Sequence, residues 1–273
     1  MNNWTAANQS DRIAYDDSGT GSPIVLLHAF PQTREMWTMQ VEGLAKRHRV
    51  VTPDLYGFGG SSLPAKGWGV DGMADAIADF LVGIGITESV VLGGLSMGGY
   101  VALAFARRHP EKLRGLILAD TKGEGDSAEA KEGRTKSMAL VQEVGVAVLT
   151  EQMLPKILGL TTHQERPAVV AEVRRVGAEQ SVEGMLAALV ALRDRPDATP
   201  ALAAIRVPTL VIVGDEDLIT PPDVAKKLAN AIPNATLVEL PLSGHLSNLE
   251  TPDLFNRAVA SFLQSVNPTR SSS

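Results

Sequence analysis

The feature that most constrains the fold is a serine between two glycines, in the segment Gly94-Leu95-Ser96-Met97-Gly98. An apolar run, residues 89–92, comes just before it, and a helix-like stretch, residues 100–109, follows it. A serine in this setting is typical of a tight turn between a strand and a helix, where a side chain at position 94 or 98 would collide with neighbouring backbone. The spacing therefore predicts that Ser96 lies on a strained turn and exposes its hydroxyl at the carboxyl end of a sheet.

Short apolar runs recur along the chain, with helix-like segments between them. Continuous runs of this length are typical of strands buried on both faces of a parallel sheet. The strands predicted in this way are Ile24–Leu27, Val50–Thr52, Val90–Leu92, Leu116–Ala119, Thr209–Val213 and Thr236–Leu240. An N-terminal hairpin strand is expected at Arg12–Tyr15 and the stretch before it, with residues 17–21 as its turn. The alternation of strands and helices predicts an α/β fold.

Helical signals accompany three further segments. Residues 72–84 place apolar side chains near helical spacing with Asp75 and Asp79 between them, so we expect an amphipathic helix over the sheet. Residues 224–231 follow two prolines and an aspartate, a common helix start. The last helix is expected at residues 252–263, with Thr251 as its N-cap.

A long segment without strands separates two of the predicted strands. Roughly ninety residues lie between Ala119 and Thr209, far more than the about 10–12 that a simple crossover needs. Apolar clusters in this segment are interrupted at Gly145, Pro155, Gly159 and Gly177, which indicates several helices. We therefore predict a helical cap at residues 121–200, inserted into a core formed by residues 1–120 and 201–273.

The composition excludes several classes of partner and site. The net charge is −6, so no cationic field attracts nucleic acid or anionic lipid. The N-terminus lacks a basic start followed by an apolar stretch, and no apolar run approaches the about 18 residues of a membrane span, so we expect a cytoplasmic protein without membrane contact. The chain has no cysteine, which excludes a disulfide, a thiolate nucleophile and a thiolate metal site. No signal indicates the oligomeric state.

No cofactor is expected from the sequence. The glycine-rich segment 93–99 lacks the Lys-Ser/Thr ending of a phosphate-binding loop, and no suitably placed acid follows it by about 20 residues, as a dinucleotide site requires. No pair of histidines has the helical spacing of a metal site. We therefore expect neither a nucleotide nor a metal.

A serine hydroxyl is a weak nucleophile, so Ser96 would need a histidine to accept its proton and an acid to orient that histidine. His48 lies in a basic run and His109 at a helix end, so both are interpreted as structural, and His163 lies in the predicted cap. His245 is different, because it follows the last strand, where a loop carries an imidazole over the carboxyl end of the sheet. His245 is the predicted base.

The acid is expected after the preceding strand. Asp215, Glu216 and Asp217 follow the strand at residues 209–213, and all three compete for the role. Asp120, at the end of another predicted strand, is a further candidate. The residues alone leave this choice open.

Four motifs in order make the chain resemble the α/β-hydrolase family, in particular its esterase and 3-oxoadipate enol-lactonase-like group. They are Leu26-Leu27-His28-Ala29-Phe30-Pro31, Asp54-Leu55-Tyr56-Gly57-Phe58-Gly59-Gly60-Ser61, Gly94–Gly98 and Gly244-His245-Leu246-Ser247-Asn248-Leu249-Glu250. The resemblance covers about residues 13–263. It implies a mostly parallel eight-stranded sheet flanked by helices, with an inserted helical cap. In this family the acid is the third residue after a glycine at the strand end, which selects Asp217 after Gly214.

The resemblance also implies an oxyanion hole formed by the backbone N–H groups of Phe30 and Met97. The family's usual His-Gly is His28-Ala29 here. Because alanine adds a methyl group and restricts φ, we expect altered loop geometry or less space beside the acyl group. His28 and Asp54 are expected to brace their loops without touching substrate covalently.

The implied function is that of a serine carboxylic ester hydrolase, acting on small neutral esters or lactones through an acyl-enzyme. An enol-lactonase, a perhydrolase or a C–C bond hydrolase would use the same residues, and a ligand-binding receptor of this fold is an alternative of another class. A haloalkane dehalogenase would need a carboxylate in place of Ser96. The candidates for a substrate pocket, each equally compatible with a place in the core, are Trp37, Trp68, Met138, Val141, Met185, Leu189 and Leu246.

Overall fold

A computed structural model describes residues 2–6, 11–63 and 69–266. Its centre is an eight-stranded sheet with the order β1-β2-β4-β3-β5-β6-β7-β8. Neighbouring strands from β4 through β8 run parallel, whereas β2 runs antiparallel to both β1 and β4. The strands are β1 (Asn2–Thr5), β2 (Arg12–Ser18), β3 (Pro23–Leu27), β4 (Arg49–Pro53), β5 (Val90–Leu95), β6 (Leu113–Ala119), β7 (Thr209–Gly214) and β8 (Ala235–Leu240). The predicted α/β architecture is confirmed, and all six predicted strands are present. The prediction that they are buried on both faces is wrong for β8, which lies at the edge of the sheet with only Leu240 buried.

The N-terminal turn was placed wrongly by the sequence. The hairpin joins β1 to β2, and Asp17 and Ser18 belong to β2, where they pair with Val51 and Val50 of β4. The Asp17 carboxylate forms an ion pair of 2.7 Å with Arg49 on the neighbouring strand. The other three residues of the predicted turn, 19–21, do lie outside the strands, between β2 and β3.

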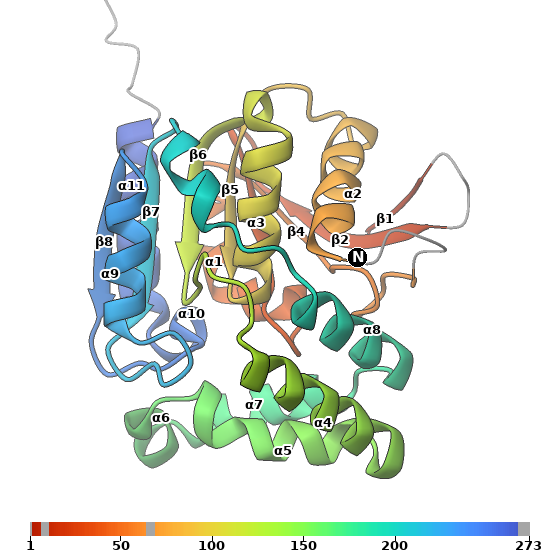
Figure 1. Ribbon diagram of the computed structural model, residues 1–273. Coiled ribbons are helices and arrows are strands. Elements are labelled where there is room, and N and C mark those ends of the chain that lie inside the picture. The colour runs from red at the N-terminus through yellow and green to blue at the C-terminus, as the bar shows by residue number, and fades with distance from the viewer. Residues whose placement is uncertain (1, 7–10, 64–68, 267–273) are drawn as a thin grey trace, which may run out of the picture.

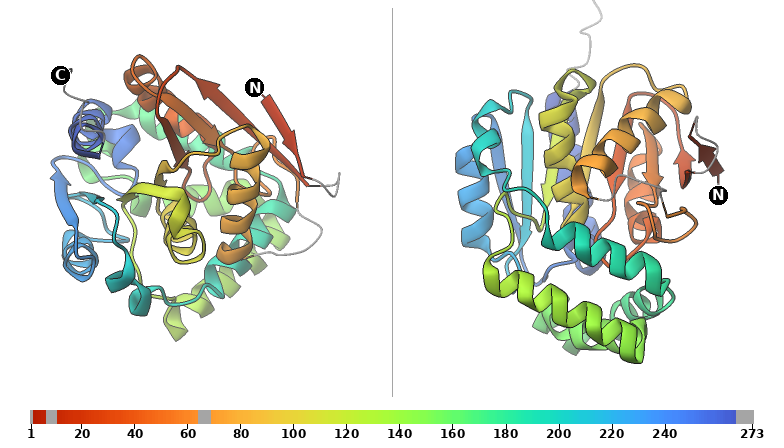
Figure 2. Two further views of the ribbon diagram at one scale, coloured as in Figure 1. Left: turned by 90° about the horizontal axis from the view of Figure 1, so that it is seen from above. Right: turned by 45° about the vertical axis from the view of Figure 1, so that its right-hand side comes forward.

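Helices cover both faces of the sheet (Figure 2). Alternate residues of β3 enter two separate apolar clusters, with Val25 and Leu27 on one face and Ile24 and Leu26 on the other, as the two-residue period of a strand requires. The first cluster includes residues of α2 (Val70–Gly83), α3 (Met97–Arg108) and α9 (Pro222–Ala231). The second includes residues of α1 (Thr38–Leu44) and α11 (Pro252–Val266). No helix within the described ranges is long and apolar enough to cross a membrane.

A helical insertion, defined here as α4 to α8, lies between β6 and β7 in the sequence. Its helices are α4 (Ala128–Val144), α5 (Val146–Ile157), α6 (Leu160–Glu165), α7 (Pro167–Ala178) and α8 (Val182–Arg193). They lie beyond the carboxyl ends of the parallel strands, at the bottom of Figure 1. The return to β7 includes the short helix η3 (Thr199–Ala204), so the predicted cap boundary at residue 200 falls within η3 and stays a prediction.

The two segments that lead into and out of the insertion, called its stems here, contact each other. Ala198 N–H donates to the Gly123 carbonyl at 2.8 Å, and the Arg195 guanidinium donates to the Glu124 carbonyl at 3.0 Å. Arg195 also forms an ion pair of 2.6 Å with the Asp126 carboxylate, and both side chains are buried. The chain therefore enters and leaves the insertion at one place.

Candidate active site

Ser96 occupies the tight turn between β5 and α3. Its backbone has φ 52° and ψ −110°, a conformation that a residue other than glycine rarely adopts. The turn is held by its neighbours, because Ser96 N–H donates to the Ala119 carbonyl at 3.0 Å and the Thr121 hydroxyl donates to the Ser96 carbonyl at 3.0 Å. The predicted strained turn is thus present at the carboxyl end of β5.

The glycines on either side of Ser96 allow this turn. A Cβ atom at Gly94 would lie 2.1 Å from the Gly98 carbonyl oxygen, and one at Gly98 would lie 2.1 Å from the Leu27 carbonyl oxygen. Both distances are far inside van der Waals contact, and the obstructing atoms belong to the backbone. A side chain at either position would therefore separate α3 from the strands that carry it.

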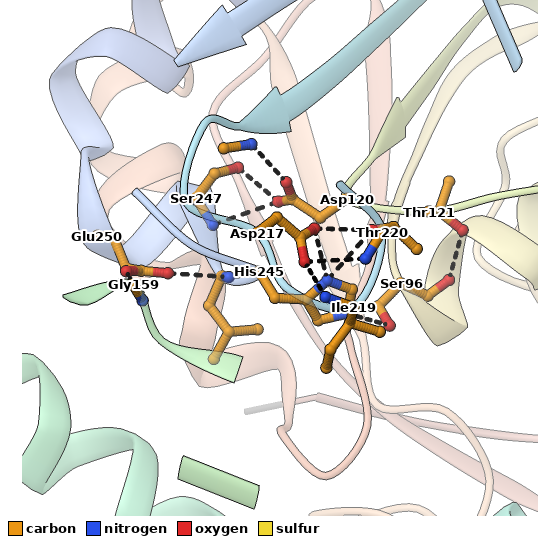
Figure 3. A network of polar contacts seen from close by, with 12 residues as sticks. Ser96, Asp120, Thr121, Gly159, Asp217, Ile219, Thr220, His245, Ser247 and Glu250 are labelled. Atoms are coloured by element: carbon orange, nitrogen blue, oxygen red, sulfur yellow. Dashed lines mark hydrogen bonds and ion pairs between the residues drawn. The ribbon is translucent and has the colours of Figure 1, made fainter. Parts of the chain in front are cut away.

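Ser96, His245 and Asp217 form a continuous hydrogen-bonded chain (Figure 3). The Ser96 Oγ to His245 Nε2 distance is 2.8 Å, and the His245 Nδ1 to Asp217 Oδ2 distance is also 2.8 Å. These residues follow β5, β8 and β7, so the parallel sheet brings them to one edge. Because a carboxylate only accepts, Nδ1 carries a proton, and Nε2 of the neutral ring is free to accept one from Ser96.

The Asp217 carboxylate is held on several sides. Its Oδ1 accepts the N–H groups of Ile219 at 2.8 Å and Thr220 at 2.9 Å, and its Oδ2 accepts the Thr220 hydroxyl at 2.7 Å. The Thr220 hydroxyl also lies 3.3 Å from His245 Nδ1. Sequence reasoning missed Thr220. The signal for this turn is Asp217 itself, because aspartate side chains commonly accept the backbone N–H two residues on, as Asp217 does from Ile219.

The other candidate acids have different partners. Asp215 is exposed and accepts the Ser243 N–H at 3.4 Å, and Glu216 accepts the Thr161 N–H at 2.9 Å. Asp120 is fully buried and accepts the Gly214 N–H at 3.0 Å and the Ser247 hydroxyl at 2.5 Å. Among these four carboxylates, all in the described part of the chain, Asp217 is the one hydrogen-bonded to His245.

The buried charges around His245 set its proton affinity. Burial lowers the pKa of His245, but the adjacent carboxylate and hydrogen bond of Asp217, with the charges of Asp120 and Glu250, outweigh burial and raise the pKa above its ordinary value. Burial raises the pKa of Asp217, but the charge and hydrogen bond of His245 lower it overall. Burial and the charge of Asp217 raise the pKa of Asp120 well above its ordinary value.

This arrangement predicts how activity depends on pH. Protonated His245 cannot accept the Ser96 proton, and its raised pKa means that protonation begins at a higher pH than for an ordinary histidine, whose pKa is about 6.5. We expect log kcat/KM for ester hydrolysis to fall by one unit per pH unit on the acid side, with a midpoint above 6.5. A rate that stays constant down to pH 5.5 would show that another group is the base.

The predicted oxyanion donors lie on two fixed backbone segments. Met97 is the first residue of α3, where a helix N–H has no acceptor in the preceding turn. The Ala29 carbonyl accepts the Gln32 N–H at 2.8 Å and is 2.9 Å from His28 Nδ1. In a trans peptide the C=O and N–H bonds point in opposite directions, so these contacts also fix the direction of the Phe30 N–H. The assignment of both donors stays a prediction.

His28 and Asp54 brace their loops by hydrogen bonds. His28 Nε2 accepts the Leu55 N–H at 2.8 Å, so the ring proton is on Nδ1 and is donated to the Ala29 carbonyl. Burial lowers the pKa of His28, which favours the neutral ring that this pattern requires. Asp54 Oδ2 accepts the Gly60 N–H at 2.9 Å, and Asp54 Oδ1 accepts the Arg34 N–H at 2.8 Å.

The predicted pocket residues divide between the two apolar clusters. Val141, Met185 and Leu189 are buried in the same cluster as Phe30 and Met97, and Met138 packs against it. Trp37 and Leu246 belong to the other cluster, where the Trp37 ring lies 5.9 Å from that of Phe255. Trp68 lies outside the described residues. The role of each in substrate binding stays a prediction.

His163 of α6 is directed at the backbone. Its Nε2 lies 3.1 Å from the Leu154 carbonyl, which links α6 to α5. Within the described residues, no group of three or more histidine, aspartate or glutamate side chains is placed to hold a metal ion.

Comparison with known proteins identifies the family. The family model described as alpha/beta hydrolase fold matches residues 22–252. The chain belongs to the α/β-hydrolase family. The family's fold accounts for the sheet order and for the position of Ser96 between β5 and α3.

Relatives within the α/β-hydrolase family cover nearly the whole chain. An esterase structure from Thermogutta terrifontis is 39% identical, with a TM-score of 0.93, and the match covers 97% of this chain and 99% of that one. The enol-lactonase structure from Burkholderia xenovorans is 29% identical, with a TM-score of 0.86 and coverage of 93% and 97%. The AB hydrolase superfamily protein YisY of Bacillus subtilis is 31% identical over 97% of this chain and 100% of its own length.

Proposed function

We propose that this α/β-hydrolase is a serine carboxylic ester hydrolase that acts on small neutral esters or lactones through an acyl-enzyme. The observation that carries the proposal is the hydrogen-bonded chain from Ser96 through His245 to Asp217. The Ser96 Oγ to His245 Nε2 distance and the His245 Nδ1 to Asp217 Oδ2 distance are both 2.8 Å. The similarity to a bacterial esterase and to an enol-lactonase supports the same reaction class. The family alone does not select a reaction, since one fold hosts many chemistries.

In the proposed acylation step, Ser96 Oγ attacks the ester carbonyl carbon while His245 Nε2 accepts the serine proton. The carbonyl oxygen becomes an oxyanion, for which the N–H groups of Phe30 and Met97 are the proposed donors. The tetrahedral intermediate then expels the alkoxide, which leaves as the alcohol with the proton from His245. Asp217 holds the imidazole in the required orientation and stabilises its charged form.

Deacylation repeats the sequence with water. His245 accepts a proton from a water molecule that attacks the Ser96 ester, and the second intermediate releases the carboxylic acid and restores the serine hydroxyl. A lactone follows the same path, except that the alcohol and the acid remain in one product. If hydrogen peroxide attacks instead of water, the product is a peracid.

The proposed function is tested with a panel of p-nitrophenyl esters and small lactones on the purified chain. Turnover of short or medium neutral esters is expected. Absence of turnover across the whole panel would favour the ligand-binding receptor. Product analysis with competing alcohols would distinguish hydrolysis from acyl transfer.

We also propose that the helical insertion selects the substrate. It lies beyond the carboxyl ends of the parallel strands (Figure 2), and Ser96 directly follows one of these strands, β5. Its residues Val141, Met185 and Leu189 share an apolar cluster with both proposed oxyanion donors. A pocket lined by these apolar side chains favours neutral acyl groups. Each acyl methylene buried against them should lower the activation free energy by about 0.8 kcal/mol, which raises the rate about fourfold. The rate should therefore rise with acyl length and then fall sharply.

Shortening Met185 or Leu189 to alanine is expected to move that fall to longer acyl chains. Both side chains are buried, at 0% and 1% exposure, so truncation adds space beside the cluster. The measurement is kcat/KM across a series of p-nitrophenyl esters. Val259→Ala, which truncates an equally buried side chain in the other cluster, is the control and should leave the length profile unchanged. An unchanged profile in folded Met185→Ala and Leu189→Ala would show that these side chains do not line the pocket.

A further inference from the structure

Glu250 is a buried carboxylate that the reaction described above does not use. It is the last residue of α10 (Ser247–Glu250), and only 2% of it is exposed. Its Oε1 accepts the Leu246 N–H at 3.1 Å, and its Oε2 accepts the Gly159 N–H at 2.8 Å (Figure 3). Leu246 directly follows His245, whereas Gly159 lies in the turn between α5 and α6. One side chain therefore joins the loop that carries His245 to the helical insertion.

The backbones on the two sides of this bridge are in close contact. A Cβ atom at Gly159 would lie 2.8 Å from the Gly244 nitrogen, and one at Gly244 would lie 2.3 Å from the Gly159 nitrogen. The loop that carries Asp217 contacts the same turn, because Glu216 accepts both the N–H and the hydroxyl of Thr161, at 2.9 Å and 2.5 Å. We call this contact, formed by Gly159, Thr161, Glu216, Gly244 and Glu250, the insertion junction.

The charge of Glu250 also acts on the imidazole. Carboxylates from three elements raise the pKa of His245, namely Asp217 from the loop after β7, Asp120 from the end of β6 and Glu250 from α10. Each negative charge stabilises the protonated ring. Glu250 differs from the other two because it also binds the helical insertion.

We propose that Glu250 is a positioning residue that holds the His245 loop in its working geometry only while the insertion is docked against it. The carboxylate is suited to this role because it has two oxygens that only accept, and each receives one backbone N–H. The inference rests on the proposed function of His245 as the base. It links the geometry of the reacting groups to the position of the insertion.

Glu250→Gln tests the proposal. The glutamine amide has one oxygen that can accept a hydrogen bond, so it can bind only one of the two N–H groups, that of Leu246 or that of Gly159. Its NH2 group would face the other N–H, and two donors do not form a hydrogen bond. The connection between the His245 loop and the insertion is therefore lost at one end. We expect kcat for a p-nitrophenyl ester to fall about tenfold, the effect of losing a hydrogen bond to a charged group. With one negative charge removed, the His245 titration should move to lower pH, both in the acid limb of the rate and in the imidazole NMR signals, identified by their loss in His245→Gln.

Two further variants distinguish the positioning role of the Glu250 carboxylate from the effect of its charge and from any effect on the stability of the fold. Glu250→Asp keeps the charge but is one methylene shorter, so kcat should fall while the titration stays near that of the wild type. Glu216→Gln is the matched control, because it weakens the same junction without contacting Leu246, and its His245 titration should not move. Each variant is compared with the wild type by circular dichroism and Tm.

The outcomes decide between the proposals. A folded Glu250→Gln variant with unchanged kcat and unchanged titration would overturn the role of Glu250, as would equal titration shifts in Glu216→Gln and Glu250→Gln. If Glu250→Gln does not fold, Gly159→Ala is used instead, because its added methyl group would push the insertion away from Gly244 at the insertion junction. An unchanged kcat in Gly159→Ala would also overturn the proposed role of Glu250. A shifted NMR titration in a chain that hydrolyses no ester would contradict the proposed function and leave the bridge between Glu250 and the His245 loop supported.

Discussion

Replacing Ser96 with alanine is expected to reduce ester hydrolysis by about a millionfold, the scale seen when a serine nucleophile is removed. Without Oγ no acyl-enzyme forms, and His245 Nε2 loses the partner that now lies at 2.8 Å. The fold should be preserved, because Ser96 is only partly buried and its backbone is held by Ala119 and Thr121. The measurement is kcat for a p-nitrophenyl ester, with circular dichroism to compare the folds.

A fluorophosphonate probe gives an independent check of the same residue. We expect one labelled serine, Ser96, and no labelling in Ser96→Ala. Ser265→Ala serves as the control, since its hydroxyl donates to the Phe262 carbonyl in α11 and takes no part in the site. Labelling that persists in Ser96→Ala would show that another serine is the nucleophile.

Asp217→Asn should reduce kcat by about ten thousandfold. An amide NH2 group in place of Oδ2 would favour the wrong imidazole tautomer, with the proton on Nε2, where it cannot accept from Ser96. The backbone N–H groups of Ile219 and Thr220 that now bind Oδ1 should still hold the side-chain oxygen, so the loop is expected to keep its shape. The measurement is kcat, with fluorophosphonate labelling rates as a second readout.

The neighbouring carboxylate provides the control for Asp217. Asp215 is exposed and its carboxylate accepts the Ser243 N–H at the long distance of 3.4 Å, so Asp215→Asn should change kcat by less than about threefold. A larger loss in Asp215→Asn or in Asp120→Asn than in Asp217→Asn would mean that the acid is misassigned.

Signals between residues close in the sequence were sufficient to predict much of the fold. The glycine spacing around Ser96 predicts its strained turn, because a Cβ atom at position 94 or 98 would lie only 2.1 Å from a backbone carbonyl oxygen. The strand predictions from β3 to β7 also succeed, since a strand buried on both faces requires an uninterrupted apolar run. Strand β8 is present too, but as an edge strand that is largely not buried. These features depend on residues that are close in the sequence.

Features that depend on contacts between distant residues were not predicted. Asp17 suggested a turn by its type, but in the structure it pairs with Val51 of β4, and its carboxylate forms an ion pair with Arg49 of the same strand. Residue order alone left Asp215, Glu216, Asp217 and Asp120 as competing acids. The resemblance to the family selected Asp217, and in the structure Asp217 is the one of these four that is hydrogen-bonded to His245. The second contact of Glu250 is with Gly159, 91 residues away, and no local pattern reveals it.

The two stems of the insertion lie side by side, and this affects how substrate specificity can change. Because Gly123 and Ala198 are hydrogen-bonded to each other, any segment whose ends meet at the same spacing could replace the one between them without stretching β6 or β7. A transplanted segment would still have to supply a glycine where Gly159 now contacts Gly244. Recombination between family members, in nature or in the laboratory, could thus exchange the helices that are proposed to select the substrate, while Ser96, Asp217 and His245 keep their places after β5, β7 and β8.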